Sequence, residues 1–75
     1  MTREEAIEKA KQAWPAWITS TTCTEGWVEE KHGVCVVGVR KMCYKRGEWE
    51  VESFSVKGMG KTWEDAFKNA KGGSQ

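Results

Sequence analysis

The 75-residue chain contains no leucine, and it has only one proline, one histidine and one aspartate. Its core must therefore come from other residues, and each of its five tryptophans can bury roughly 150–250 Å². A chain this short buries only about 60% of its unfolded surface, so we expect one small domain over residues 1–75. Five tryptophans exceed what such a core needs, which predicts a surface contact patch containing one or two of them.

The sequence also lacks an excess of charge and a long apolar run. Lys and Arg number 12 and Asp and Glu 11, for a net charge of +1, whereas nucleic-acid-binding domains are usually clearly basic. No segment approaches the roughly 18 apolar residues of a membrane span, and the charged first residues do not form a signal peptide. Three cysteines, an odd number, are typical of reduced thiols. We expect a cytoplasmic protein without a membrane partner.

Two segments have helical periodicity. Thr2 and Glu5 have the spacing of a capping box and predict a helix over 2–14, which ends before Pro15. Thr62 is a good N-cap for a second helix over 62–71. The predicted apolar stripes consist of Ala6, Ile7, Ala10, Ala13 and Trp14 in the first helix, and of Trp63, Ala66, Phe67 and Ala70 in the second.

Three strands are predicted between the helices, over 22–30, 34–44 and 49–57. The second begins with an almost continuous β-branched run, typical of a central strand. The segments 31–33 and 44–48 predict two hairpin turns. Before the first strand, Trp17 and Ile18 lead into a run of Thr and Ser that is either a linker or the start of a strand.

Alternation along the strands predicts which residues share a face. On the second strand Cys35, Val37, Val39 and Cys43 lie on one side, and Arg40 and Met42 on the other. On the third strand the apolar residues change parity between Val51 and Phe54, and one extra residue near Glu52–Ser53, a bulge, accounts for that change.

The expected fold is α+β with the element order α-β-β-β-α. Two successive hairpins form a three-stranded antiparallel sheet, and two amphipathic helices cover one face of it. The opposite face is then open to solvent or to a partner.

Metal binding and catalysis are not expected. Cys23, His32, Cys35 and Cys43 have the spacing Cys-x8-His-x2-Cys-x7-Cys, which contains no close cysteine pair of the kind that structural zinc sites use. Asp65 is explained as a helix-terminal acid, and His32 lies in a turn, so no nucleophile and base are placed together. The prediction is free thiols, with no metal, no cofactor and no enzymatic activity.

A glycine-rich segment precedes the second helix. Gly58-x-Gly60-Lys61-Thr62 is similar to a phosphate-binding loop at a helix N-terminus. A strand-to-helix turn with a cap is the alternative, and turn chemistry favours it.

The same segment carries a family resemblance. Its Gly-x-Gly-x-Thr pattern is followed by alanines at positions +8 and +12, and with the α-β-β-β-α order it resembles the double-stranded-RNA-binding domain. The residues concerned are Gly58, Gly60, Thr62, Ala66 and Ala70.

The resemblance implies duplex RNA binding through the first helix, the loop between the first two strands, and lysines at the start of the last helix. Lys31 and His32 lie in the corresponding loop, and Glu8 or Gln12 would act on the first helix. Where the family has its lysine cluster, this chain has Trp63, Glu64 and Asp65. The resemblance therefore supports the fold more than the activity.

A basic stretch interleaved with aromatic residues is the candidate binding surface. Cations beside aromatic rings can stack on bases, form protein-binding hot spots, or belong to a solvated sheet edge. The candidate residues are Arg40, Tyr44, Lys45, Arg46 and Trp49, with Lys31 and His32.

The leading expectation is a non-enzymatic interaction module that binds a larger protein. In style it resembles the small accessory or inhibitor proteins that phages and mobile elements encode. The alternative is binding of double-stranded RNA or another nucleic acid. A homodimer, formed through the open sheet face or an edge strand, is a further expectation.

Overall fold

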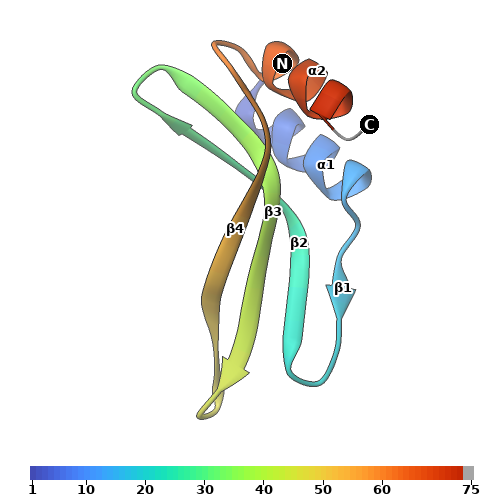
Figure 1. Ribbon diagram of the computed structural model, residues 1–75, viewed down its shortest axis with the longest axis vertical. Coiled ribbons are helices and arrows are strands. Elements are labelled where there is room, and N and C mark those ends of the chain that lie inside the picture. Colours follow the sequence, from blue (N-terminus) through green and yellow to red (C-terminus); the bar gives the residue numbers. More distant parts are fainter. Residues whose placement is uncertain (74–75) are drawn as a thin grey trace.

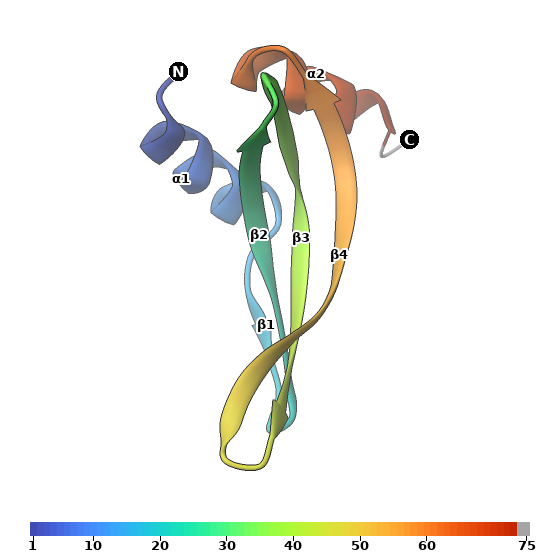
Figure 2. The same cartoon turned by 90° about the vertical axis from the view of Figure 1, so that its left-hand side faces the viewer.

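The computed structural model describes residues 1–73, which form two helices and four strands (Figure 1). All four strands belong to one antiparallel sheet with the order β1-β2-β3-β4. Both helices lie on the same face of this sheet, at the end that contains the β2–β3 turn (Figures 1 and 2). In chain order the elements are α1 (Arg3–Ala13), β1 (Trp17–Ile18), β2 (Thr22–Lys31), β3 (Val34–Lys45), β4 (Glu48–Gly60) and α2 (Trp63–Gly73).

The expected three-stranded sheet is wrong, because β1 adds a fourth strand. Trp17 pairs with Thr24 and Ile18 with Cys23. Thr19 closes the connection to β2: its hydroxyl oxygen accepts a hydrogen bond from the N–H of Thr22 at 2.9 Å. Two residues are too few to show an alternating pattern, so the sequence alone leaves this segment open between linker and strand.

The other elements lie close to their predicted ranges. β4 is the exception, since it continues to Gly60 rather than ending at residue 57. Both hairpin turns are tight two-residue turns in which every central residue has a positive φ, as type I′ turns require. These residues are His32 and Gly33, with φ of 54° and 75°, and Arg46 and Gly47, with φ of 53° and 85°.

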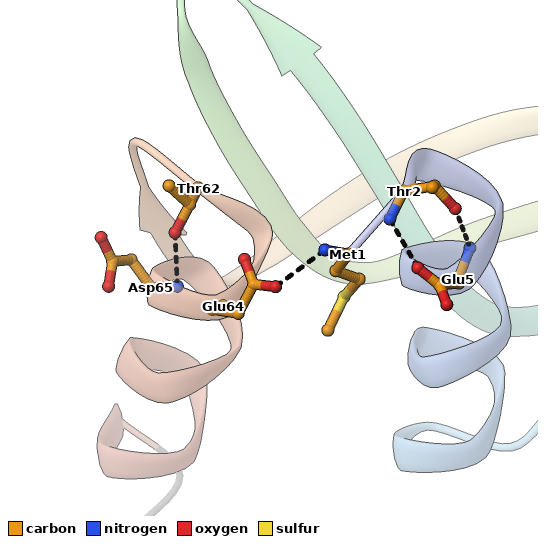
Figure 3. Close-up of polar contacts among 6 residues, drawn as sticks. All are labelled: Met1, Thr2, Glu5, Thr62, Glu64 and Asp65. Atoms are coloured by element: carbon orange, nitrogen blue, oxygen red, sulfur yellow. Dashed lines mark hydrogen bonds and ion pairs between the residues drawn. The ribbon is translucent and has the colours of Figure 1, made fainter.

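Polar contacts at their N-terminal ends fix the two helices (Figure 3). The predicted capping box is present, with the N–H of Thr2 donating to Glu5 and the N–H of Glu5 donating to the Thr2 hydroxyl. Thr62 accepts from the N–H of Asp65 at 3.1 Å, which confirms it as the cap of α2. The amino group of Met1 lies 2.9 Å from Glu64 Oε2 and connects the two helix ends. That hydrogen bond lowers the pKa of Glu64.

Small residues allow both helices to approach the sheet closely. A Cβ atom added at Gly26 of β2 would overlap the backbone of Ala10 in α1, and one added at Gly58 of β4 would overlap Ala66 and Ala70 in α2. The predicted stripe of α2 faces this contact, and so do Ala6 and Ala10 of α1, whereas Ile7 and Trp14 are partly buried beside it and Ala13 is exposed. The buried core consists of Ala6, Ala10, Val28, Cys35, Val37, Trp63, Ala66, Phe67 and Ala70.

The core therefore occupies only one end of the molecule. The β3–β4 hairpin and the β1–β2 connection extend beyond the helices, and no helix covers that half of the sheet (Figures 1 and 2). The molecule is accordingly elongated, with principal extents of 38 × 27 × 18 Å. In the described part of the chain, neither helix has the length and apolar character needed to cross a membrane.

Candidate functional site

The strand register shows which face of the sheet each residue occupies, because residues opposite one another in an antiparallel pair point to the same side. Gly26 and Gly58 face the helices, and so do the buried Val28 and Val37. The intervening residues point the other way, onto what we call the far face. Its apolar residues are Ile18, Cys23, Trp27, Val34, Val36, Met42, Tyr44, Trp49, Val51, Phe54, Val56 and Met59.

Two bulges keep the apolar side chains of β4 on the far face. Lys41 pairs with Ser53 and Met42 with Val51, so Glu52 is an extra residue. This confirms the bulge predicted near Glu52–Ser53. A second register shift, between Val37 and Gly38, makes Lys57 the other extra residue. Each shift changes the parity by one, so five apolar side chains of β4 share the far face, each 40–53% exposed: Trp49, Val51, Phe54, Val56 and Met59.

The far face consists of rows that cross the strands. One row crosses all four, through Ile18, Cys23, Met42 and Val51. The next two are Glu25–Arg40–Phe54 and Trp27–Gly38–Val56. At the helix-covered end, Figure 2 looks onto this side of the sheet, with both helices behind it, and the twist of the sheet turns the other half edge-on, with β4 in front and β1 behind. The rows thus form a continuous apolar surface that contains one ion pair.

The tip of the β3–β4 hairpin is a second distinct surface. Tyr44 and Trp49 face each other across the strands, with their ring centroids 5.2 Å apart in an edge-on arrangement. Lys45 and Arg46 lie beside them at the turn, and Lys45 pairs across the strands with Glu48. We call Tyr44, Lys45, Arg46 and Trp49 the hairpin tip.

The structure divides the predicted binding surface into three parts. Four of its seven residues form the hairpin tip. Arg40 lies further along β3 and forms an ion pair with Glu25, while its Nε is buried without a hydrogen-bond partner among the described residues. Lys31 and His32 lie at the β2–β3 turn, at the other end of β3. Twelve residues of extended strand span roughly 40 Å, so one small ligand cannot contact both ends.

On the helix side of the long hairpin, three polar side chains form a cluster. Glu52 accepts a hydrogen bond from Cys43 Sγ at 2.6 Å and lies 3.2 Å from Lys41 Nζ. The hydrogen bond from Cys43, followed by the contact with Lys41, lowers the pKa of Glu52. The same hydrogen bond raises the pKa of the Cys43 thiol. The cluster therefore favours a carboxylate and a neutral thiol.

The remaining chemical candidates are dispersed. Within residues 1–73, no three His, Cys, Asp or Glu side chains gather where they could hold a metal ion. Cys35 is buried against the helices, and burial raises the pKa of its thiol. Gly58 and Gly60 belong to β4 and lie directly against α2, where an added Cβ would overlap helix atoms. Helix packing explains these glycines, and it leaves no space for a phosphate group between strand and helix.

A groove separates the two helices. It has a volume of about 510 Å³, and Trp14 and Phe67 stack in it with ring centroids 6.2 Å apart. Lys9 places its Nζ 5.1 Å from the centre of the Phe67 ring. Trp14 and Phe67 are thus partners in the contact between the helices.

The sequence predicts an open sheet face that is free for a partner or a second copy, but it does not identify most of the residues on that face. Ile18 lies in a segment that the sequence predicts only as a linker or the start of a strand, and the pattern of Phe54 and Val56 indicates only a bulge. The sequence signal for the far face is the bulge in β4. It places Trp49 and Val51 on the same side of the sheet as Phe54 and Val56. Deciding which side requires the contacts of Gly26 and Gly58 with the helices, and these are tertiary. No protein-family model, curated protein or solved structure matches the chain, so the resemblance to the double-stranded-RNA-binding domain stays a prediction.

Proposed function

We propose that this protein is a non-enzymatic accessory protein that binds a larger protein through the hairpin tip. The observation that carries the proposal is the exposed Tyr44–Trp49 pair beyond the helix-covered part of the sheet, with Lys45 and Arg46 beside it. Tyr, Trp and Arg are the residues most often found at binding hot spots. Two rigid rings also lose little conformational entropy when they enter a pocket on a partner.

The charges around the tip support a protein partner over a nucleic acid. Within 44–50, Lys45 and Arg46 are balanced by Glu48 and Glu50. Nucleic-acid binding depends on an excess of positive charge near the phosphates. The first turn of α2, where the resembled family has lysines, carries Glu64 and Asp65. A surface with mixed charge and two aromatic rings suits an apolar protein pocket with a polar rim.

The test is capture of a partner from a lysate with tagged wild-type protein and tagged variants. A specific partner is retained by the wild type and lost with Trp49→Ala and with Arg46→Ala. Loss of a hot-spot residue weakens binding by about 30-fold or more.

The chain offers matched controls for both substitutions. His32→Ala changes the first residue of the other type I′ turn, whose φ of 54° matches the 53° of Arg46. Trp17→Ala removes an exposed tryptophan away from the tip. Equal retention of a protein by the tip variants and the controls contradicts the proposal, as does the absence of any retained protein. Micromolar binding of duplex RNA that weakens steeply with salt would favour the nucleic-acid alternative instead.

A further inference from the structure

The far face from the hairpin tip to the strands that carry the helices on their other side is unusually apolar for an exposed surface. Five of its side chains are about half or more exposed, and four more lie partly exposed among them. From their exposed fractions, their accessible area is roughly 600 Å² per chain, at the upper limit of what monomers of ordinary size expose in one patch. The five are Ile18, Val51, Phe54, Val56 and Met59, and the four are Cys23, Trp27, Val36 and Met42.

This surface lacks the second layer that sheets normally have. A sheet with an apolar face is stable when that face packs against another layer. Here the helices cover only the opposite face, at one end (Figure 2). The register shifts at Glu52 and Lys57 turn the apolar residues of β4 away from the helices. The strand pairing itself therefore places these residues on the far face.

The charges on the far face indicate which kind of partner surface can pack against it. Arg40 is paired with Glu25 inside the face. Glu29 and Lys31, further along β2, add one charge of each sign. The face therefore has no net charge, and it does not require a partner surface of opposite charge. An identical face placed against it meets no net electrostatic repulsion.

We infer that the far face binds a second copy of this chain, forming a symmetric face-to-face dimer of two sheets. In such a dimer each copy contributes the same patch, and side chains of the two sheets interdigitate to fill a layer about 10 Å thick. Complete burial of the two patches would remove roughly 1,200 Å² from solvent, at the lower limit for stable interfaces. Phe54 and Val56, in adjoining rows, lie near the centre. Tyr44 and Trp49 of the hairpin tip lie on the same face but outside this patch, in the row nearest the turn, so the tip stays available to the larger protein.

The test is the mass of the purified full chain by sedimentation equilibrium, from low micromolar to submillimolar concentration. The wild type reaches twice the mass of one chain. Phe54→Lys and Val51→Lys each place an unpaired charge in the interface, and symmetry places it there twice. Each substitution therefore weakens the dimer by at least about a hundredfold.

Ser53→Lys is the matched control, because Ser53 is exposed on the same strand and points to the helix side. It leaves the dimer intact. Circular dichroism on every variant shows whether the fold is retained. If Phe54→Lys unfolds the chain, Val51→Lys alone tests whether a charge on the far face weakens the dimer. A wild-type chain that is monomeric at every concentration overturns the inference, and so does a dimer that persists in both folded far-face variants. A monomeric chain that still captures a larger protein through the tip overturns only the dimer.

Discussion

The ring of Trp27 on β2 contacts the ring of Phe54 on β4, with centroids 4.6 Å apart, although β3 lies between the two strands. The contact crosses β3 at Gly38, which pairs with Trp27 and has no side chain to separate the rings. A Cβ atom at this glycine would also overlap the carbonyl oxygen of Ser55. One glycine thus permits both the close approach of β3 to β4 and the aromatic contact at the centre of the far face.

This pair should contribute energy beyond the area that each ring buries. In a double-mutant cycle with Trp27→Leu and Phe54→Leu, we expect a coupling of about 0.5–1.5 kcal/mol in the free energy of unfolding. Urea denaturation of the four proteins, at concentrations where the chain is monomeric, measures it. A coupling of zero would mean that the rings do not interact in solution.

The docking of α2 depends on the small size of Gly58. We expect Gly58→Ala to destabilise the fold by at least about 2 kcal/mol, because the new methyl group overlaps backbone atoms that cannot rotate away. Ser55→Ala, an exposed change on the same strand, should shift stability by less than about 0.5 kcal/mol. Thermal or urea unfolding gives both values. Equal stability of the two variants would show that α2 does not pack on β4 this closely.

The hydrogen bond between Cys43 and Glu52 should slow thiol chemistry. Because Glu52 raises the pKa of Cys43, less thiolate is present at mildly alkaline pH, and the thiolate is the reactive form. Glu52→Gln should therefore accelerate alkylation of Cys43 by iodoacetamide, measured by peptide mass spectrometry. Cys23, which points to the far face, is the internal reference and should react at an unchanged rate. An unchanged rate at Cys43 would argue against the hydrogen bond.

Because the fold lowers the pKa of Glu52, we expect the free energy of unfolding to depend on pH through this residue. The pKa of Glu52 is lowered in the fold, so its contribution is present above its ordinary pKa and is lost as the pH falls through the lowered value. The wild type should be more stable than Glu52→Gln at neutral pH, and the two should converge in acid. Glu50→Gln, a change to another exposed residue of β4, is the control. Unfolding curves from neutral to acidic pH provide the comparison, and a constant difference between wild type and Glu52→Gln would contradict the expectation.

Local signals in the sequence predicted the features that depend on neighbouring residues. The capping box of Thr2 and Glu5, the cap at Thr62 and the turn at Arg46–Gly47 each depend on residues a few positions apart, and all three are present. The change of parity between Val51 and Phe54 also sufficed to locate a bulge, since a strand has a strict period of two.

Features that depend on distant residues could not be predicted in the same way. β1 exists because Trp17 and Ile18 pair with β2, and two residues carry no pattern of their own. The side that β4 presents to the helices depends on the contacts of Gly58 with Ala66 and Ala70. The separation of His32 from the hairpin tip follows from the length of β3, because both turns are basic and look alike in sequence.

The far face is proposed to be a contact surface between copies of the chain, and this contact can be observed directly. The most direct measurement is an isotope-filtered nuclear Overhauser experiment on an equal mixture of labelled and unlabelled chains, which detects contacts only between different molecules. We predict contacts from the Phe54 ring of one copy to the methyl groups of Val51, Val56 or Met59 of the other. Intermolecular contacts confined to helix-side residues such as Lys41 and Ser53, or no intermolecular contacts at submillimolar concentration, would contradict the account.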